Sequence, residues 1–206
     1  MAKDAPQATR PHIPGYGIPD VAEGMLSWAE VRGAFTTAPR YWIATTDRDG
    51  APHLIQQWGA FIDACLYFEG GSGTRWARNL AREPRIGVSV EADGLAIMLE
   101  GRVERLTPDT ALADAIIASY RTKPYGYIPD PKNWDGDGLV EVRPARVFAW
   151  RYENFTTTAT RFAFHARRPR AFPRRARGGS ARAATAPARR APSATPASRS
   201  PVSPAR

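Results

Sequence analysis

Residues 41–61, YWIATTDRDGAPHLIQQWGAF, contain the pattern that decides the fold. Residues 41–46 are rich in aromatic and β-branched side chains, residues 47–50 read Asp-Arg-Asp-Gly, and residues 52–61 return as a second strand-like stretch. Two such runs joined by a short turn rich in Asp and Gly are typical of a β-hairpin. The stretch therefore predicts an antiparallel pair of strands, the second of which continues to Phe61.

The chain repeats this pattern after the hairpin. Turn residues, rather than long helices, separate most of the runs, which favours an antiparallel sheet or barrel over a parallel α/β sheet. Pro144 marks an expected break in the last run. The further strand signals are residues 64–69, 85–91, 95–106 and 140–155.

Short helices are expected at three places. Ser27 and Glu30 fit a capping box, and the helix that they open ends at Pro39. A second helix spans residues 74–83, between a glycine-rich turn and Pro84. A third opens with Thr107 as its cap and Pro108 at its first position, and the segment from Lys123 to Gly138 after it reads as a loop.

Charge divides the chain into a domain and a tail. Residues 1–161 carry 18 Lys plus Arg against 20 Asp plus Glu, whereas residues 162–206 carry 11 Arg and no acidic residue. A segment made mainly of Arg, Ala, Pro, Ser and Gly cannot bury enough apolar surface to offset its ordering entropy. We therefore predict a flexible N-terminal arm at 1–24, one folded domain at 25–164 and a disordered basic tail at 165–206.

Several classes of protein are disfavoured by composition. The single cysteine, Cys65, excludes an internal disulfide framework, and we expect no metal site. The first twenty residues contain four prolines and no apolar run, so we expect neither a signal peptide nor a membrane span, and a cytoplasmic location. No nucleophile–base–acid set is recognisable, which leaves catalytic residues unassigned and points to a cofactor as the source of any chemistry.

The stretch most informative about function is residues 70–80, GGSGTRWARNL. A glycine-rich turn that leads into a helix leaves backbone N–H groups unpaired, and the helix dipole adds positive potential at the same point. Thr74 can add a hydroxyl, and Arg75 and Arg78 could flank a phosphate from one helix face. The alternative is that the glycines only form a turn and the arginines only a solvated helix face.

Read in order, these segments resemble the pyridoxamine 5′-phosphate oxidase-like family of FMN-binding split β-barrels, which includes deazaflavin-dependent reductases. The resemblance covers roughly residues 26–164. The segments similar to the family are 41–46 with 49–53, residues 73–80 followed by Pro84-Arg85, residues 100–103, and residues 158–162. It implies a mainly β fold, a split β-barrel of antiparallel strands with short peripheral helices.

The resemblance also implies a site and a function. Gly73, Thr74, Arg75 and Arg78 would hold the phosphate of FMN or coenzyme F420, and the strand residues Ile55, Gln56, Gln57 and Trp58 would run along its ring system. Family members are usually homodimers with the cofactor at the subunit interface. The implied activity is an oxidoreductase that transfers a hydride between this cofactor and an unknown organic substrate.

Two residues bear on phosphate binding at the expected site. Trp76 stands where many relatives have a basic residue, which removes one phosphate contact. Glu69 would weaken phosphate binding by repulsion unless Arg75 or Arg78 neutralises its charge.

Two alternative functions stay open. One is a non-catalytic flavin-binding or storage protein, because acid–base residues are missing from the sequence pattern. The other, which we rank last, is nucleic-acid binding through the basic tail. The abrupt change in composition near residue 162 suggests that the tail is a frameshifted or recently acquired extension.

Overall fold

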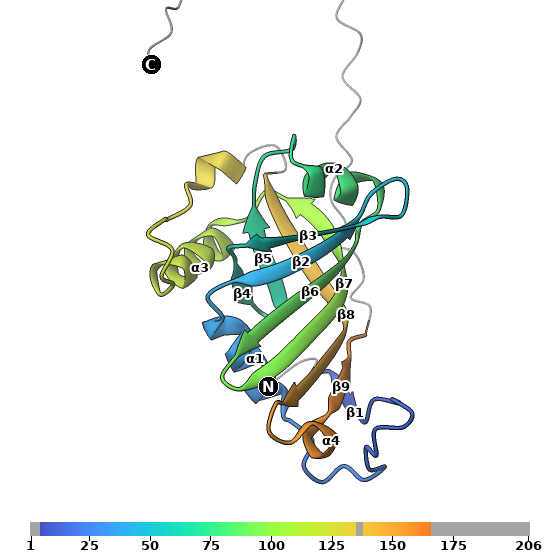
Figure 1. The fold of residues 1–206 in the computed structure, drawn as a ribbon. Helices are drawn as coiled ribbons and strands as arrows, with labels where there is room; N and C mark the ends of the chain where they lie inside the picture. Colours follow the sequence, from blue (N-terminus) through green and yellow to red (C-terminus); the bar gives the residue numbers. More distant parts are fainter. Residues whose placement is uncertain (1–4, 135–137, 166–206) are drawn as a thin grey trace, which may run out of the picture. The chain divides into compact units, whose positions relative to one another are not determined.

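The computed structural model describes residues 5–134 and 138–165, and within them nine strands form one antiparallel sheet (Figure 1). The strands pair in the order β1-β9-β8-β7-β6-β2-β3, while β5 pairs with β8 and β4 with β5. Among the described residues β3 and β4 do not pair, so the sheet is not closed. This confirms the predicted mainly β split-barrel fold with short peripheral helices.

The strands are β1 (Gln7–Thr9), β2 (Tyr41–Thr46), β3 (Pro52–Gln57), β4 (Ala60–Ile62), β5 (Cys65–Glu69), β6 (Arg85–Ala92), β7 (Leu95–Leu106), β8 (Leu139–Arg151) and β9 (Thr160–Ala163). The helices are α1 (Trp28–Thr37), α2 (Arg75–Arg82), α3 (Thr110–Arg121), the 3-10 helix η1 (Pro131–Trp134) and α4 (Phe155–Thr158). The predicted hairpin is formed by β2 and β3, in a register that places Tyr41 opposite Gln57.

The chain changes strand partner at Trp58 and Gly59, which corrects the prediction of one strand from Pro52 to Phe61. β3 pairs with β2, whereas β4 pairs with β5. A Cβ at Gly59 would lie 2.8 Å from the carbonyl oxygen of Tyr67, so glycine allows the close backbone approach at this joint. The two residues therefore separate two different strand ladders.

The long strand β8 also has two partners along one edge. Its first residues pair with β5 and its later residues with β9, while β7 accompanies it along the other edge. Pro144 lies where the β7–β8 register shifts, opposite Gly101, and a Cβ at Gly101 would come within 2.4 Å of the Arg143 carbonyl oxygen. The predicted break at Pro144 is therefore a bulge. The strand ends at Arg151, so that Phe155, which we had expected at its end, lies in α4 instead.

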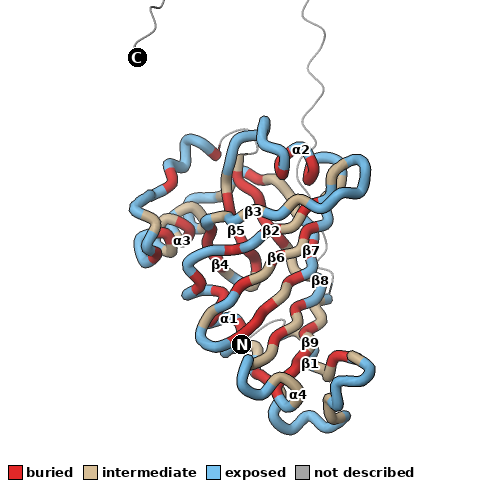
Figure 2. Tube along the Cα trace, viewed as in Figure 1, coloured by how far each residue is buried: buried red, intermediate tan, exposed pale blue. Residues whose placement is uncertain are grey.

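The apolar residues form two cores. The larger core fills the inside of the barrel, as the buried stretches of β2, β6, β7 and β8 in Figure 2 show. A smaller core lies under α3, where Ile116 and Tyr120 meet Cys65, Tyr67 and Leu139. The polar and partly exposed strand β3 contributes no fully buried residue.

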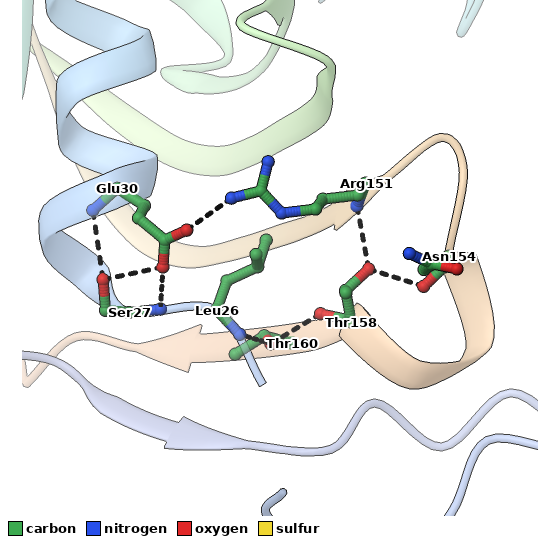
Figure 3. Close-up of polar contacts among 7 residues, drawn as sticks. All are labelled: Leu26, Ser27, Glu30, Arg151, Asn154, Thr158 and Thr160. Carbon is green, nitrogen blue, oxygen red and sulfur yellow. Dashed lines mark hydrogen bonds and ion pairs between the residues drawn. The ribbon is translucent and has the colours of Figure 1, made fainter. Parts of the chain in front are cut away.

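The first helix starts at the predicted capping box. The Ser27 hydroxyl accepts the Glu30 N–H at 3.2 Å, and the Glu30 carboxylate accepts the Ser27 N–H at 2.9 Å (Figure 3). The same carboxylate pairs with Arg151 at 2.5 Å, which ties the start of α1 to the end of β8. These hydrogen bonds and this pairing hold the pKa of Glu30 below its ordinary value, the Ser27 backbone bond contributing most.

The third helix starts two residues later than predicted. Its N-cap is Asp109 rather than Thr107, because the Asp109 carboxylate accepts the Leu112 N–H at 2.9 Å. After this helix, Lys123 is buried: its Nζ donates to the carbonyl oxygens of Thr36 and Ala38 at 2.6 and 2.5 Å. Burial lowers the pKa of Lys123 to about 8. The lysine fixes the following segment to the end of α1.

The N-terminal arm, for which we expected no regular structure, contains β1. This strand pairs antiparallel with β9, and the Arg10 guanidinium next to it donates to the carbonyl oxygens of Thr157 and Ala159 at 2.7 and 3.0 Å. The predicted tail, residues 165–206, lies outside the described residues except for His165.

Candidate functional site

A cavity of about 910 Å³ opens between the end of β3, the turn after β5, α2 and the segment that follows α3. This volume is within the range of about 300–1,000 Å³ that is typical of ligand pockets. Its described lining residues are Gln56, Gln57, Trp58, Glu69, Gly70, Gly71, Ser72, Ala77, Arg78, Ala81, Arg105, Tyr120, Tyr127, Asn133 and Gly138.

The glycine-rich turn forms one wall of this cavity and leads into α2. Thr74 is the N-cap: its hydroxyl accepts the Ala77 N–H at 3.3 Å and donates to the Gly71 carbonyl oxygen at 2.9 Å. A Cβ at Gly71 or Gly73 would meet no atom within 4 Å, so both residues border open space. The turn and the helix start thus present backbone N–H groups where an anion could approach.

Two buried side chains hold α2 against the barrel. Trp76 packs edge-on against Phe68 with ring centroids 5.3 Å apart, and a Cβ at Gly70 would lie 2.7 Å from the Trp76 ring. The Asn79 amide donates to the Thr45 hydroxyl at 3.0 Å. Trp76 therefore faces the core and positions the helix, and it does not itself line the cavity.

The two arginines predicted to flank a phosphate differ in position. Arg78 lines the cavity, and its guanidinium donates to the carbonyl oxygen of Gly73 within the turn. Arg75 instead pairs with Asp47, in the turn between β2 and β3, at 2.9 Å. Asp47 also accepts the N–H groups of Asp49 and Ala51 at 3.0 and 2.9 Å. The hydrogen bond from the Arg75 side chain is the largest cause that holds the pKa of Asp47 below its ordinary value.

The strand residues predicted to run along a ring system also lie in two different places. Gln56, Gln57 and Trp58 line the cavity, whereas Ile55 packs against the barrel core. The Gln57 side chain donates to the backbone oxygen of Glu69 at 2.7 Å, which joins β3 to the end of β5. The turn and the strand end, far apart in sequence, therefore meet at one cavity.

Glu69 is bound by residues other than Arg75 and Arg78, the two arginines that could have neutralised its charge. Its carboxylate accepts the Tyr127 hydroxyl at 2.6 Å and also the indole N–H of Trp134. The hydrogen bond to Glu69 raises the pKa of Tyr127 to about 12. Burial, assisted by the Glu69 charge, raises the pKa of Tyr120 as well. Both phenols therefore stay protonated at neutral pH.

The sequence did not reveal the tyrosines that join Trp58 in the aromatic wall of this cavity. Trp58 stacks on Tyr125, with ring centroids 5.0 Å apart and planes at 11°, and lies 5.9 Å from the ring of Tyr127. Tyr120 contacts Tyr125 and Tyr127 at 5.3 and 6.4 Å. The available signal was the three aromatic residues in the segment from Lys123 to Gly138, which we had described only as a loop.

Residues 5–134 and 138–165 contain no cluster of three or more His, Cys, Asp or Glu residues that could hold a metal ion. No helix in this part of the chain is long and apolar enough to cross a membrane.

An open antiparallel barrel with a capped, glycine-rich turn at its cavity defines a protein of the split β-barrel class. The chain belongs to the pyridoxamine 5′-phosphate oxidase family, whose sequence model matches residues 27–151. This confirms the resemblance found in the sequence, and the match includes the hairpin, the turn and α2.

Comparison with solved structures supports the same fold. The conserved hypothetical protein Rv2991 from Mycobacterium tuberculosis is 22% identical, with a TM-score of 0.52 over 64% of this chain and 88% of that chain. A putative 5-nitroimidazole antibiotic resistance protein from Bacteroides thetaiotaomicron VPI-5482 is 13% identical, with a TM-score of 0.50 over 68% and 87%. No curated protein sequence matches the chain.

Proposed function

We propose that the protein is an oxidoreductase that binds FMN or coenzyme F420 in the 910 Å³ cavity and transfers a hydride between this cofactor and an organic substrate. The observation that carries the proposal is the meeting of two segments at one cavity. The turn with Arg78 forms one side and Gln56 to Trp58 another, in agreement with the phosphate and ring positions that the family resemblance implies.

The residues present fit such a group. Gly71 and Gly73 leave space for a phosphate close to the backbone, and the start of α2 supplies N–H donors with a favourable dipole. Arg78 would add a charge-assisted hydrogen bond. Arg75 would join it only by leaving Asp47. The cofactor itself supplies the hydride chemistry when bound.

The protein's part is to bind, orient and exclude water. Gln56 and Gln57 have amide donors and acceptors suited to the polar edge of a ring system, and the Gln57 amide is held in place by Glu69. Trp58 and Tyr127, which line the cavity beside these amides, would limit the access of water to it. Because the high pKa of Tyr127 keeps its hydroxyl protonated, this group stays a hydrogen-bond donor across the neutral range.

We also propose a homodimer with the cofactor near the interface. Trp42 and Leu54 lie on one face of the β2–β3 hairpin and are 44% and 59% exposed. With Met98 they line a shallow, mainly apolar hollow. Gln56 is exposed on the same strand and also lines the cavity, so the apolar surface adjoins the proposed cofactor site. Leu54→Glu should convert a dimer to monomer in light scattering.

Titration of the purified full-length protein tests the function. FMN and F420 are each titrated by calorimetry, and the complex is then reduced and offered organic acceptors. We expect one cofactor to bind, Arg78→Gln to weaken it at least tenfold, and Arg121→Gln, on α3 away from the cavity lining, to leave affinity unchanged. Failure of both cofactors to bind refutes the proposal. Binding without turnover supports the storage alternative.

A further inference from the structure

The aromatic wall of the cavity, formed by Trp58, Tyr120, Tyr125 and Tyr127, offers a flat surface on which the ring of a ligand can stack. Trp58 and Tyr127 are 42% and 39% exposed, although each contacts other aromatic rings of the wall. The stacking of Trp58 on Tyr125 fixes the indole in one orientation, which lowers the entropic cost of stacking a ligand on it. The volume, near the top of the range for ligand pockets, leaves room for a second molecule beside a cofactor.

Glu69 places a negative charge in this wall. Its carboxylate is bound by the hydroxyl of Tyr127 and the indole N–H of Trp134, two neutral donors. None of the ion pairs among the described residues involves Glu69. The hydrogen bonds therefore orient the carboxylate without neutralising its charge.

The charges around the cavity determine which substrate fits once the cofactor is bound. Among the described residues of its lining, the charged side chains are Glu69, Arg78 and Arg105. The phosphate monoester of FMN carries a charge of about −1.5 to −2 at neutral pH, which is similar in size to the combined charge of the two arginines. A second anion in the cavity would then face the Glu69 charge, and among the described lining residues no further cationic side chain balances it.

We propose that the substrate subsite is the wall of Trp58 and Tyr127, that its ligand is a planar, uncharged aromatic compound, and that Glu69 determines this specificity by repelling anionic analogues. The inference rests on the proposed function, because the charge balance assumes a phosphate-bearing cofactor. Trp58 supplies the stacking surface, and Tyr127 holds the Glu69 carboxylate at the edge of that surface.

Two probes of equal shape test this inference: 2-naphthamide, which is neutral, and 2-naphthoate, which is anionic. Each is titrated by calorimetry into the full-length protein saturated with whichever oxidised cofactor it binds. We expect the amide to bind about tenfold more tightly than the naphthoate. The reason is the repulsion between the naphthoate charge and the Glu69 charge, which has about this size in a partly solvated cavity. Glu69→Gln should reduce the ratio of the two affinities to near one, and Trp58→Leu should weaken both probes.

The control is Glu91→Gln, an exposed carboxylate on β6 outside the cavity lining, which should leave the ratio unchanged. Cofactor affinity is measured for every variant, so that saturation is ensured and a misfolded variant is recognised. A cofactor-loaded protein that binds both probes equally, or a ratio that persists in Glu69→Gln, overturns the inference while the proposed function stands. Absence of binding by FMN and F420 overturns both.

Discussion

Replacing Asp47 by Asn should strengthen binding of a phosphate-bearing cofactor. Asp47 holds the Arg75 guanidinium at 2.9 Å, away from the turn at which a phosphate would bind. Arg75 itself holds the pKa of Asp47 below its ordinary value, so the pair is intact at neutral pH. Asparagine keeps a carbonyl oxygen for the N–H groups of Asp49 and Ala51, which preserves the turn, but removes the charge that binds Arg75.

The size of the effect follows from exposure of the pair. The Arg75 and Asp47 side chains are 50% and 22% exposed, so the pair is a surface ion pair that competes weakly with a phosphate. We expect the affinity for FMN to rise about two- to fivefold in Asp47→Asn. Riboflavin, which has the same ring system and no phosphate, should bind with unchanged affinity.

Calorimetric titration of both ligands measures the effect, with Asp49→Asn as the matched control because that carboxylate is 83% exposed and its ion-pair partner among the described residues is Arg48. If F420 is the cofactor, its phosphate-free deazaflavin core replaces riboflavin. An equal change for both ligands, or weaker FMN binding, would show that Asp47 supports the site instead of competing for Arg75.

Three further predictions concern stability. Ser27→Ala removes the capping box and should cost about 1 kcal/mol, seen as a fall of roughly 2–4 °C in the thermal midpoint, while Thr36→Ala near the exposed end of the same helix should change it less. Gly101→Ala places a Cβ 2.4 Å from a backbone carbonyl and should cost more than about 2 kcal/mol in urea unfolding; Gly33→Ala, which meets no atom within 4 Å, should be neutral or stabilising. The third involves Lys123, whose pKa is lowered by burial from 10.5 to about 8, so that the folded state binds fewer protons than the unfolded state between these values. The free energy of unfolding should therefore rise by about 1–2 kcal/mol from pH 8 to 9.5 relative to Lys123→Met, and parallel pH curves would contradict this assignment.

Local chemistry made much of the fold predictable. The hairpin turn, the Ser27 capping box and the glycine-rich start of α2 depend on neighbouring residues, and the structure has all three. The partner change at Gly59 was not predictable, because it depends on Tyr67, a residue of another strand. The choice of Asp109 over Thr107 as a cap was missed because both residue types serve in that position.

The candidate site was predictable only where its residues are adjacent in sequence. The turn and the strand end were found, but not that Asp47 would bind Arg75 across 28 residues. Glu69 was recognised as a charge near the site, yet its partners Tyr127 and Trp134 come from a segment without periodicity. Such contacts are set by how the chain packs, and composition alone does not contain them.

The joint at Trp58 and Gly59 determines which substitutions this edge of the cavity can accept. Trp58 lies in the connection between two ladders and has no cross-strand partner in the register of β3 or β4, so a different side chain there leaves both registers as they are. Gly59 next to it has no such freedom, since its missing side chain makes the crossing possible. Under the proposed function, Trp58 is therefore the natural site for a saturation library that alters ligand preference, while the adjacent Gly59 keeps the architecture intact.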